Sequence, residues 1–305
     1  MPHSWAQLDR ITGSRGAALS GCKTIASLGA GLAWDDDGAC LRDAFEPLDE
    51  SSISLRLQQN QLFPLPLINV YLSVGSTNEK LAGLEKSQRM HGMTYLAEHQ
   101  SAGKGRAGRS WLTPLGGQIA MSVCLRFQSD VRLEGLSLAV GVSVAQTLQD
   151  HQISGAQLKW PNDVLLNGKK LAGILIQVVP ERTHSDVIVG MGLNYALGNA
   201  GSGIDLPRAD LASTGVSLVP RNVLAADLLC AFLKMADRFT AHGYTYYKRD
   251  WELLNAHQGQ RVLMLVGDKQ HRGTLMGTDE TGAAIVMTEQ GRQVFHAGEV
   301  SLRGE

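Results

Sequence analysis

Residues 159–176 read KWPNDVLLNGKKLAGILI, and this stretch sets the expectation for the fold. Pro161 fixes a turn, an apolar run follows, and Asn167-Gly168 is a type I′ hairpin signal that leads into a second apolar run. The pattern predicts two antiparallel strands, with Lys170 at the start of the second. Taken alone, the stretch is also compatible with a surface hairpin whose lysine pair is solvated, the commoner outcome for lysines.

Strand and helix patterns alternate on both sides of this hairpin. Residues 119–127 and 186–195 are rich in strand formers, whereas residues 135–148 and 222–241 show the helical spacing of apolar positions. We therefore expect an α+β catalytic domain with a mixed sheet over residues 51–256.

The two ends of the chain differ from this middle part in their pattern of strand-like and helix-like runs. Residues 257–305 contain short strand-like runs divided by turn sequences such as Gly267-Asp268, which is typical of a small SH3-like β-barrel. Residues 1–50 contain two helix-like runs, 5–12 and 15–28, followed by a hairpin-like stretch over 34–41. That order predicts a winged helix-turn-helix domain.

Composition excludes several classes of protein. The 28 basic and 29 acidic side chains give a net charge of −1, so no global field would draw the chain to nucleic acid or to anionic lipid. The four cysteines match no metal-binding spacing and no secreted disulfide framework. Neither a secretion signal nor an apolar run of roughly 18 residues is present, so we expect a cytoplasmic protein without a membrane segment.

Residues 98–111 read EHQSAGKGRAGRSW and form the densest candidate ligand loop. Its glycines let the backbone approach a ligand closely, and Lys104, Arg106 and Arg109 would attract a phosphate or a carboxylate. A solvated basic turn is an equally good interpretation of such a loop by itself.

The same loop satisfies the G-x-G-x-x-G fingerprint of dinucleotide-binding folds, but its context argues against that fold. The fingerprint should open a helix and be followed by an acidic residue about 20 positions later. Here residues 110–117 are turn-rich and run into a strand, and no acid occurs between the loop and Asp130.

Residues 187–194, VIVGMGLN, form a further motif. The stretch reads as a buried strand, and its two glycines either belong to an ordinary core strand or mark the close approach of a ligand.

Taken together, these motifs resemble the biotin protein ligases. The loop at 103–109, the run at 159–163, the strand at 170–173, the motif at 190–194 and Gly75-Ser76-Thr77-Asn78 occur in the order and spacing of that family. The similarity continues into the C-terminal segment and more weakly into the N-terminus, so it covers essentially the whole chain. It implies a biotin/lipoate ligase-type catalytic domain, an SH3-like barrel and a degenerate winged helix-turn-helix domain.

The resemblance also implies substrates and site residues. The substrates would be biotin and ATP, with Mg²⁺ carried by ATP and no protein-bound metal, and the partner would be the biotin carboxyl carrier protein of acetyl-CoA carboxylase. The resemblance assigns catalysis to Lys170 and Arg106. It assigns biotin binding to Ser76, Thr77, Asn78, Gln100, Lys104, Gly105, Arg106, Lys170 and Gly173. For the nucleotide it assigns Lys104, Arg106, Trp111, Asn162, Lys170, Asn194, Lys269 and Arg303.

Two positions depart from the family pattern. Lys104 stands where the family loop usually has an arginine, so the charge is kept but the bidentate fork is lost. Arg208 stands where an aromatic residue often stacks on adenine, and its guanidinium plane could stack in the same way.

Three other functions have to be distinguished from that of a biotin protein ligase. A lipoate ligase would share the fold, but lipoate offers only an apolar tail to the polar residues at 76–78 and Gln100. A biotin-sensing transcription factor would not need Lys170 and Arg106, and a bifunctional ligase and repressor of the biotin operon is a further alternative. Homodimer formation is left open.

The N-terminal segment argues against strong DNA binding. Arg15 and Lys23 are the basic side chains of the candidate recognition helix, residues 35–37 are three consecutive acids, and two residues precede His3, where a supporting helix would be expected. Phosphate contacts supply most non-specific affinity for DNA. We therefore expect a vestigial winged domain that binds DNA weakly, with a true repressor as the alternative.

Overall fold

A computed structural model describes residues 32–35, 38–41, 46–198, 208–215, 217–298 and 300–304 of the chain. The predicted hairpin near the N-terminus is present: β1 (Leu32–Asp35) pairs antiparallel with β2 (Gly38–Leu41). The two preceding helix-like runs, with Arg15 and Lys23, lie outside the described residues, so the winged domain and its DNA contacts stay predictions.

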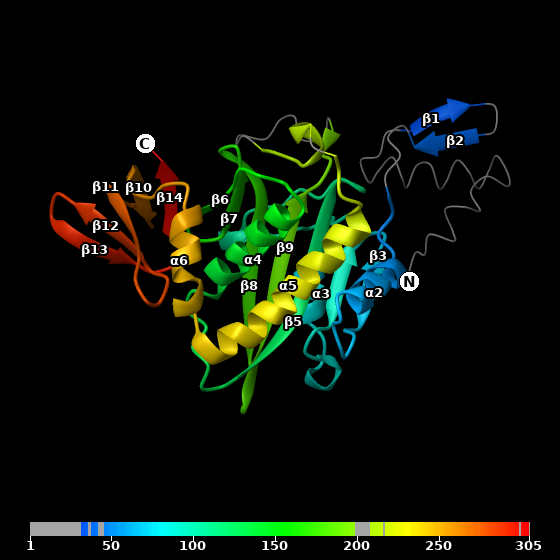
Figure 1. The fold of residues 1–305 in the computed structure, drawn as a ribbon, viewed down its shortest axis with the longest axis horizontal. Helices are drawn as coiled ribbons and strands as arrows, with labels where there is room; N and C mark the ends of the chain where they lie inside the picture. Colours follow the sequence, from blue (N-terminus) through cyan, green and yellow to red (C-terminus); the bar gives the residue numbers. More distant parts are fainter. Residues whose placement is uncertain are drawn as a thin grey trace.

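A seven-stranded mixed sheet forms the centre of the molecule (Figure 1). Only β3 and β4 pair in parallel among its described neighbours. In spatial order the strands are β3 (Ile68–Tyr71), β4 (Thr94–Ala97), β5 (Gln118–Gln128), β9 (His184–Asn194), β8 (Lys169–Pro180), β7 (Asp163–Leu166) and β6 (Ala156–Lys159).

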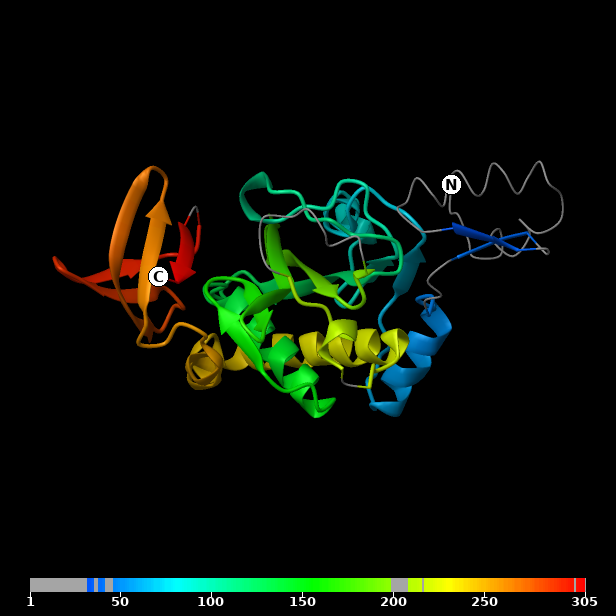
Figure 2. The same cartoon turned by 90° about the horizontal axis from the view of Figure 1, so that it is seen from above.

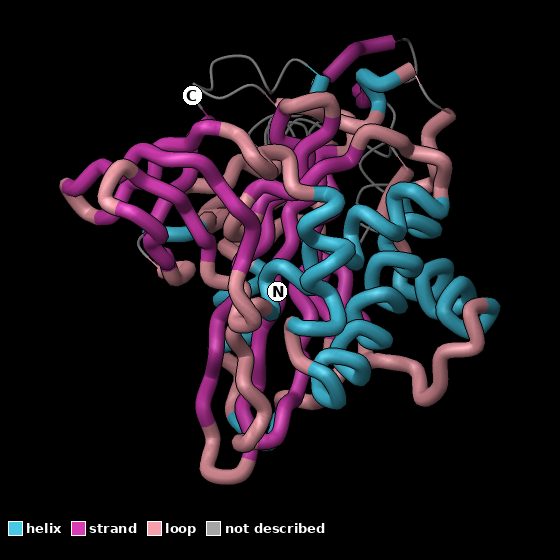
Figure 3. The backbone as a smooth tube through the Cα atoms, turned by 60° about the vertical axis from the view of Figure 1, so that its left-hand side comes forward, coloured by secondary structure: helices cyan, strands magenta, loops and turns pink. Residues whose placement is uncertain are grey.

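Four helices cover one face of this sheet, and a short helix lies on the other (Figures 2 and 3). The covering layer contains α2 (Glu50–Gln59), α4 (Leu136–Asp150), α5 (Arg221–His242) and α6 (Thr245–Leu254), and the opposite face carries α3 (Thr77–Ala82). Three 3₁₀ turns complete the described helical segments: η3 (Lys86–Gln88), η4 (Arg106–Gly108) and η6 (Ala212–Thr214). The main apolar core lies between the sheet and the four-helix layer, where burial of whole side chains such as Phe127, Phe232 and Phe239 stabilises the fold.

The β7–β8 hairpin forms as its sequence predicts. Asn167 and Gly168 both have positive φ, 51° and 75°, as a type I′ turn requires. Lys169 is exposed, whereas the side chain of Lys170 is 25% exposed and paired with Asp163. The turn therefore places Lys169 in solvent and Lys170 in a partly buried ion pair, so the two lysines do not form a fully solvated pair.

The C-terminal strands form the predicted small barrel. They make a five-stranded antiparallel sheet in the order β13-β12-β11-β10-β14. Its strands are β10 (Arg261–Val266), β11 (Lys269–Thr278), β12 (Ala284–Thr288), β13 (Gly291–Phe295) and β14 (Val300–Gly304). Trp160 Nε1 donates to the carbonyl of Gly282 at 3.0 Å, and the Tyr244 and Thr278 hydroxyls lie 2.8 Å apart. The barrel is thus docked on the catalytic domain through the end of β11 and the turn that follows it.

A fully buried ion pair in the catalytic domain joins the start of α5 to the end of β4. Arg221 Nη2 lies 2.7 Å from Glu98 Oε2, and neither side chain is exposed. The other Glu98 oxygen accepts from the backbone N–H of Leu48 at 2.6 Å, and Arg221 also donates to the carbonyls of Glu46 and Gln118. Burial raises the pKa of Glu98 and the arginine opposes that rise. Because Glu98 is held in this way, the backbone is anchored two residues before Gln100.

None of the helices in the described ranges is both long and apolar enough to cross a membrane.

Candidate active site

A pocket opens on the face of the sheet that carries α3, where the glycine-rich loop crosses β5, β8 and β9. The structure brings most of the sequence-predicted residues together there. Those lining the pocket are Ser76, Thr77, Asn78, Gln100, Lys104, Gly105, Arg106, Trp111, Asn162, Lys170 and Gly173.

One end of the pocket is a connected set of hydrogen-bonded side chains, here called the polar cluster: Thr77, Asn78, Gln100, Thr113 and Ser122. The Gln100 Oε1 atom accepts from the backbone N–H of Thr77 at 2.8 Å, and its Nε2 donates to Thr113 Oγ1 at 3.1 Å. Ser122 Oγ lies 2.7 Å from both Thr77 Oγ1 and Asn78 Oδ1. Because an amide oxygen can only accept, Ser122 donates to Asn78.

Local sequence explains why this cluster is ordered. Ser76 is the N-cap of α3 and its side chain accepts from the Glu79 backbone N–H at 3.4 Å, which starts the helix at Thr77. Asn78 Nδ2 in turn donates to the carbonyl of Leu175 on β8 at 3.4 Å. Ser76, Thr77 and Asn78 are all about 5% exposed or less, so the cluster is held before any ligand arrives.

Glycines in the central strands make room for the side chains above them. A Cβ atom at Gly190 would overlap the Asn78 amide, and one at Gly192 would overlap the Trp111 indole. At Gly173 a Cβ atom would lie 2.9 Å from Cζ3 of the same indole. The glycines in β8 and β9 thus admit pocket side chains close to the sheet, which favours the close-approach interpretation of this motif over an ordinary core strand.

Trp111 is tied to the cationic end of the pocket by a buried relay of amides. Its Nε1 donates to Gln118 Oε1 at 3.0 Å, and Gln118 Nε2 donates to Asn194 Oδ1 at 2.7 Å. The Asn194 Nδ2 atom donates to the carbonyls of Ala209 and Lys170, at 2.9 and 3.2 Å. Asn194 is fully buried and does not line the pocket, so its place in the structure is to hold the backbone beneath Lys170.

Two cations flank the Trp111 ring. Lys170 Nζ lies 5.3 Å and the Arg208 guanidinium carbon 5.9 Å from the ring centroid, both within cation–π range. The Lys170 ammonium also lies 2.6 Å from Asp163 Oδ1. This end of the pocket is therefore positive, while Asp163 balances part of the charge.

The glycine-rich loop adds three further cations, Lys104, Arg106 and Arg109. Its turn, η4, contains Ala107 at φ 53°, a conformation that non-glycine residues adopt rarely. Lys104 forms a salt bridge with Glu79, half exposed on both sides. Arg106 donates to Asn162 Oδ1 at 3.2 Å and to the carbonyls of Gly298 and Val300 at the barrel. The loop is held by these side-chain contacts and by backbone hydrogen bonds, among them Trp111 N–H to the Gly103 carbonyl at 2.8 Å.

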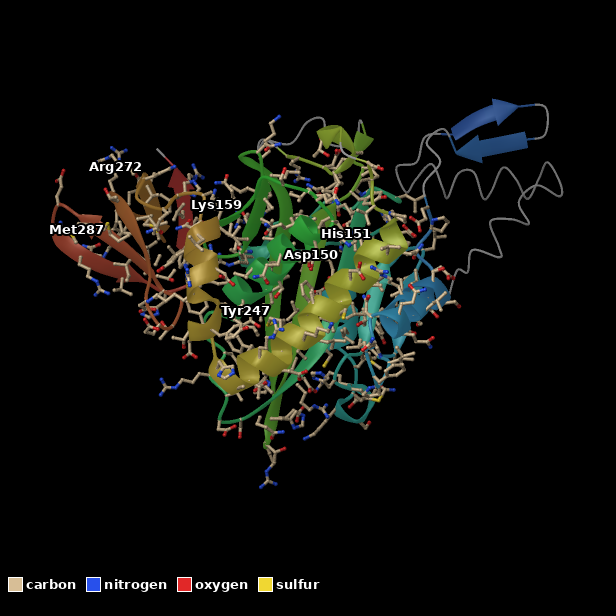
Figure 4. All side chains as sticks on the ribbon, in the orientation of Figure 1. Asp150, His151, Lys159, Tyr247, Arg272 and Met287 are labelled. Atoms are coloured by element: carbon tan, nitrogen blue, oxygen red, sulfur yellow. The ribbon has the colours of Figure 1, made fainter. Side chains whose placement is uncertain are left out.

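The positive charge extends toward the barrel. Burial lowers the pKa of Arg106, with Arg109 adding to the effect, although an arginine remains charged. Burial also lowers the pKa of Lys159, whose charge is opposed by Lys170, Arg303 and Arg109 and supported by Asp163. Figure 4 shows Lys159 between the sheet and the barrel. A cationic region thus runs from the pocket to β14.

Two predicted barrel residues do not line the pocket. Arg303 is exposed on β14 opposite Leu263. Its charge acts on the cationic region by helping to lower the pKa of Lys159. Lys269 is exposed at the β10–β11 turn, paired in register with Val266. Arg272 and Met287 lie on the part of the barrel away from the sheet (Figure 4).

Sequence reasoning missed Ser122, and it did not connect Lys159 or Arg208 to the cationic end. Ser122 is a buried polar residue in the otherwise apolar run of β5 and lies opposite Gly190 on β9. A lone hydroxyl within a buried strand is the signal that could have identified it, since buried polar groups need partners. Within the described part of the chain, no group of three or more His, Cys, Asp or Glu side chains could hold a metal ion.

Comparison with known proteins agrees with this fold and pocket. Residues 70–194 match the Biotin/lipoate A/B protein ligase family, and residues 257–303 match the biotin protein ligase C-terminal domain. The chain is 30% identical over 307 residues to the Bifunctional ligase/repressor BirA of Escherichia coli strain K12, which covers 99% of this chain and 93% of the relative. It is 33% identical over 218 residues to the Biotin--[acetyl-CoA-carboxylase] ligase of Paracoccus denitrificans, covering 68% and 90% of the two chains.

A solved structure supports the same assignment. The biotin protein ligase from Aquifex aeolicus in complex with biotin and ATP matches with a TM-score of 0.69 and 27% identity, over 78% of this chain and 99% of that chain. The sheet, the pocket and the barrel define a protein ligase of the biotin and lipoate class. Within that class, the chain belongs to the biotin protein ligase family.

Proposed function

We propose that this protein activates biotin with MgATP to give biotinyl-5′-AMP and then transfers biotin to one lysine of the biotin carboxyl carrier protein of acetyl-CoA carboxylase. The observation that carries the proposal is a single pocket with the polar cluster at one end and Lys170, Arg106 and Arg208 at the other. A neutral ring and an anionic tail would each meet the end that suits it.

The polar cluster would bind the ureido ring of biotin. A ureido group offers one carbonyl acceptor and two N–H donors, and the cluster offers hydroxyls and amides of both kinds. Asn78 and Gln100 each use one of their two amide N–H bonds in the described contacts, so a further donor remains on each for the ring carbonyl. The cluster argues against lipoate, which has no polar ring to satisfy these groups.

The cationic end would stabilise the first half-reaction. The biotin carboxylate attacks the α-phosphorus of ATP, a bond to phosphorus forms, and pyrophosphate leaves with the electrons of the bond that breaks. The two reactants are both anions, so fixed cations aimed at the transferring phosphoryl group are expected to contribute most. Lys170 would face the carboxylate and the phosphate, and Arg106 and Lys104 would close over them.

Magnesium ions supply charge neutralisation on the triphosphate when ATP is bound. Mg²⁺ is commonly held by one or two carboxylates together with substrate phosphates. Asp163, whose carboxylate lies beside the Lys170 ammonium, fits that requirement, and Asn162 offers an amide oxygen next to it. These residues would orient the nucleotide while the cations bind its oxygens.

In the second half-reaction the carrier lysine amine attacks the carbonyl carbon of the mixed anhydride. A C–N bond forms, AMP leaves with its oxygen, and the amine loses a proton. Closure of residues 103–109 would exclude water, which otherwise hydrolyses the adenylate. The exposed cations Lys269 and Arg303 on the barrel would meet the nucleotide or the carrier.

The test combines the protein with biotin, MgATP and an isolated biotin carboxyl carrier domain. Intact mass spectrometry should show the carrier gaining one biotinyl group, and a carrier whose acceptor lysine is changed to arginine should gain none. With lipoate in place of biotin, the carrier mass should stay unchanged. An unmodified carrier in the biotin reaction, or modification by lipoate at a similar rate, would refute the proposal.

We also propose that transcriptional repression is absent or weak, because Arg15 and Lys23 give the candidate recognition helix little positive charge. A mobility shift on the promoter of the organism's own biotin-synthesis operon, with biotin and ATP at moderate salt, tests this. Sequence-specific binding at nanomolar protein that Arg15→Ala abolishes would instead support a bifunctional ligase and repressor, the function that the name of the Escherichia coli relative states.

A further inference from the structure

Arg208 enters the pocket beside Lys170. The two residues form a parallel β-bridge, and the backbone N–H of Ala209 donates to the carbonyl of Lys170 at 3.0 Å. Asn194 holds both backbones from below. The Arg208 side chain lines the pocket with its guanidinium near one face of Trp111. Its position is therefore fixed by the backbone on one side and by the indole on the other.

Arg208 differs from the other pocket cations in its hydrogen bonding. Lys104 pairs with Glu79, Lys170 with Asp163, and Arg106 with three oxygens, while Arg109 Nε donates to the Arg106 carbonyl. In the part of the chain that the structure describes, Arg208 Nη1 is buried and has no hydrogen-bond partner. Burial also lowers the pKa of this guanidinium, although it stays charged at neutral pH.

An unpaired buried guanidinium N–H is costly, because the group has lost water without gaining an acceptor. The free energy is recovered if a ligand oxygen completes the site, and an anionic oxygen does so best, since charge-assisted hydrogen bonds are about twice as strong as neutral ones. The edge of a nucleobase is neutral and is a poorer complement to this charge.

Strand β8 shows which anion can reach Arg208. The polar cluster contacts β8 at Leu175 through Asn78, Trp111 covers Gly173, and Arg208 bridges to Lys170. At roughly 3.3 Å per residue, Leu175 and Lys170 lie about 16 Å apart along the strand. Biotin is shorter than that span, so a carboxylate whose ring sits in the polar cluster meets the Lys170 side chain, which runs back along β8 to Gly173, before it reaches Arg208. The next anion along the strand is the α-phosphate of the nucleotide.

We propose that Arg208 binds a non-bridging α-phosphate oxygen of the nucleotide, instead of stacking on the adenine base. This role rests on the proposed ligase function. The guanidinium carbon lies 5.9 Å from the Trp111 ring centroid, and the buried Nη1 without a described partner is left for the phosphate. Arg208 thereby adds a charged nucleotide contact where relatives are expected to place an aromatic ring.

The experiment compares AMP with adenosine, which differ only in the phosphate. Dissociation constants are measured by calorimetry in the presence of biotin for the wild-type protein, Arg208→Met, Arg208→Lys and Arg208→Phe. The matched control is Lys169→Met, which removes an exposed cation beside the same strand. We expect Arg208→Met to weaken AMP binding about 10- to 100-fold, as for loss of one charged hydrogen bond, to leave adenosine binding unchanged, and to be partly rescued by lysine.

Three results would overturn the proposal. Equal losses for AMP and adenosine, or wild-type AMP affinity in Arg208→Phe, would assign Arg208 to the base. Weaker biotin binding without nucleotide would assign it to the carboxylate. Unchanged affinity for all ligands in Arg208→Met would leave it without a binding role. The measurement needs no turnover, so a wild-type protein that binds AMP but fails to biotinylate the carrier would refute the proposed function and not this inference.

Discussion

The two ends of the pocket differ in how their polar groups are paired. In the polar cluster, Thr77, Asn78, Gln100 and Ser122 bond to one another and to the sheet. The side chains of Thr77, Asn78 and Ser122 are at most 5% exposed. At the cationic end, Lys104 holds a half-exposed glutamate, Arg106 holds main-chain carbonyls and Arg208 Nη1 has no described partner. Exposed ion pairs contribute little, so they are easily exchanged.

This difference indicates a division of labour. Under the proposed function, the polar cluster is organised before biotin binds, so recognition there would cost little ordering free energy. The cationic end would exchange protein acceptors for phosphate oxygens, which would couple loop closure to nucleotide binding. Substitutions at the ring end should therefore change biotin affinity, and those at the cationic end should change the rate of adenylate formation.

Lys170→Ala should have the largest effect. Loss of one positioned cation at a transferring phosphoryl group is expected to cost on the order of 2–4 kcal/mol, or roughly 30- to 1000-fold in adenylate formation. Pyrophosphate release measures the rate, and thermal unfolding checks that the fold is kept. The control is Lys169→Ala, one residue earlier and exposed. Release at nearly the wild-type rate in Lys170→Ala would remove this residue from the mechanism.

Gly192→Ala should come next, because the added methyl group overlaps the Trp111 indole at the cationic end. Overpacking of this kind costs about 1–3 kcal/mol, and we expect roughly tenfold or greater loss of overall activity together with a changed tryptophan fluorescence. Gly75→Ala is the matched control, since a Cβ atom there meets nothing within 4 Å. If Gly192→Ala and Gly75→Ala behave alike, the indole is not held where the structure has it.

Arg106→Ala should slow adenylate formation by roughly tenfold, as for one charged hydrogen bond, but its distinctive result is leakage. The side chain joins the loop to Asn162 and to the barrel, so its loss should open the seal over the adenylate. Biotinylation of bystander lysines on an unrelated protein, relative to carrier modification, measures the leak. A slower variant with an unchanged ratio would contradict the sealing role.

Ser122→Ala should have the smallest effect and should act only at the ring end. Removing the hydroxyl leaves the Asn78 amide oxygen without its donor, at a cost of about 1 kcal/mol or roughly fivefold in biotin affinity. The rate at saturating biotin should stay near wild type. Ser143→Ala is the control, since that buried serine bonds only within α4. A fall in rate at saturating biotin would show that the two ends are not separable.

Local signals in the sequence predicted the features that depend on local geometry. The Asn167-Gly168 turn forms as expected, and the glycine-rich loop and the α3 start lie in one pocket because each carries its own turn or cap chemistry. The barrel was predictable for the same reason, from short strands divided by turns. The exact domain limits and the nucleotide roles of the barrel cations stay predictions.

Features that depend on long-range register were not predictable from local pattern. Ser122 meets Asn78 because β5 pairs with β9 so that Ser122 faces Gly190, and nothing near residue 122 specifies that register. Arg208 reaches Lys170 through a bridge between segments far apart in sequence. Lys104 was expected over the substrate, and the salt bridge with Glu79 shows an additional partner that spacing alone could not reveal.

The buried pair of Glu98 and Arg221 has a consequence for how this sequence can diverge. Losing either member alone strands a charge in the core at about 3–5 kcal/mol, whereas replacing both by apolar residues of similar volume is often neutral. A single substitution at either position would remove a large share of the free energy of unfolding, which is about 5–15 kcal/mol for a typical domain. The two positions, 123 residues apart, should therefore be inherited as a unit and change together among descendants, so that the history of one can be read from the other.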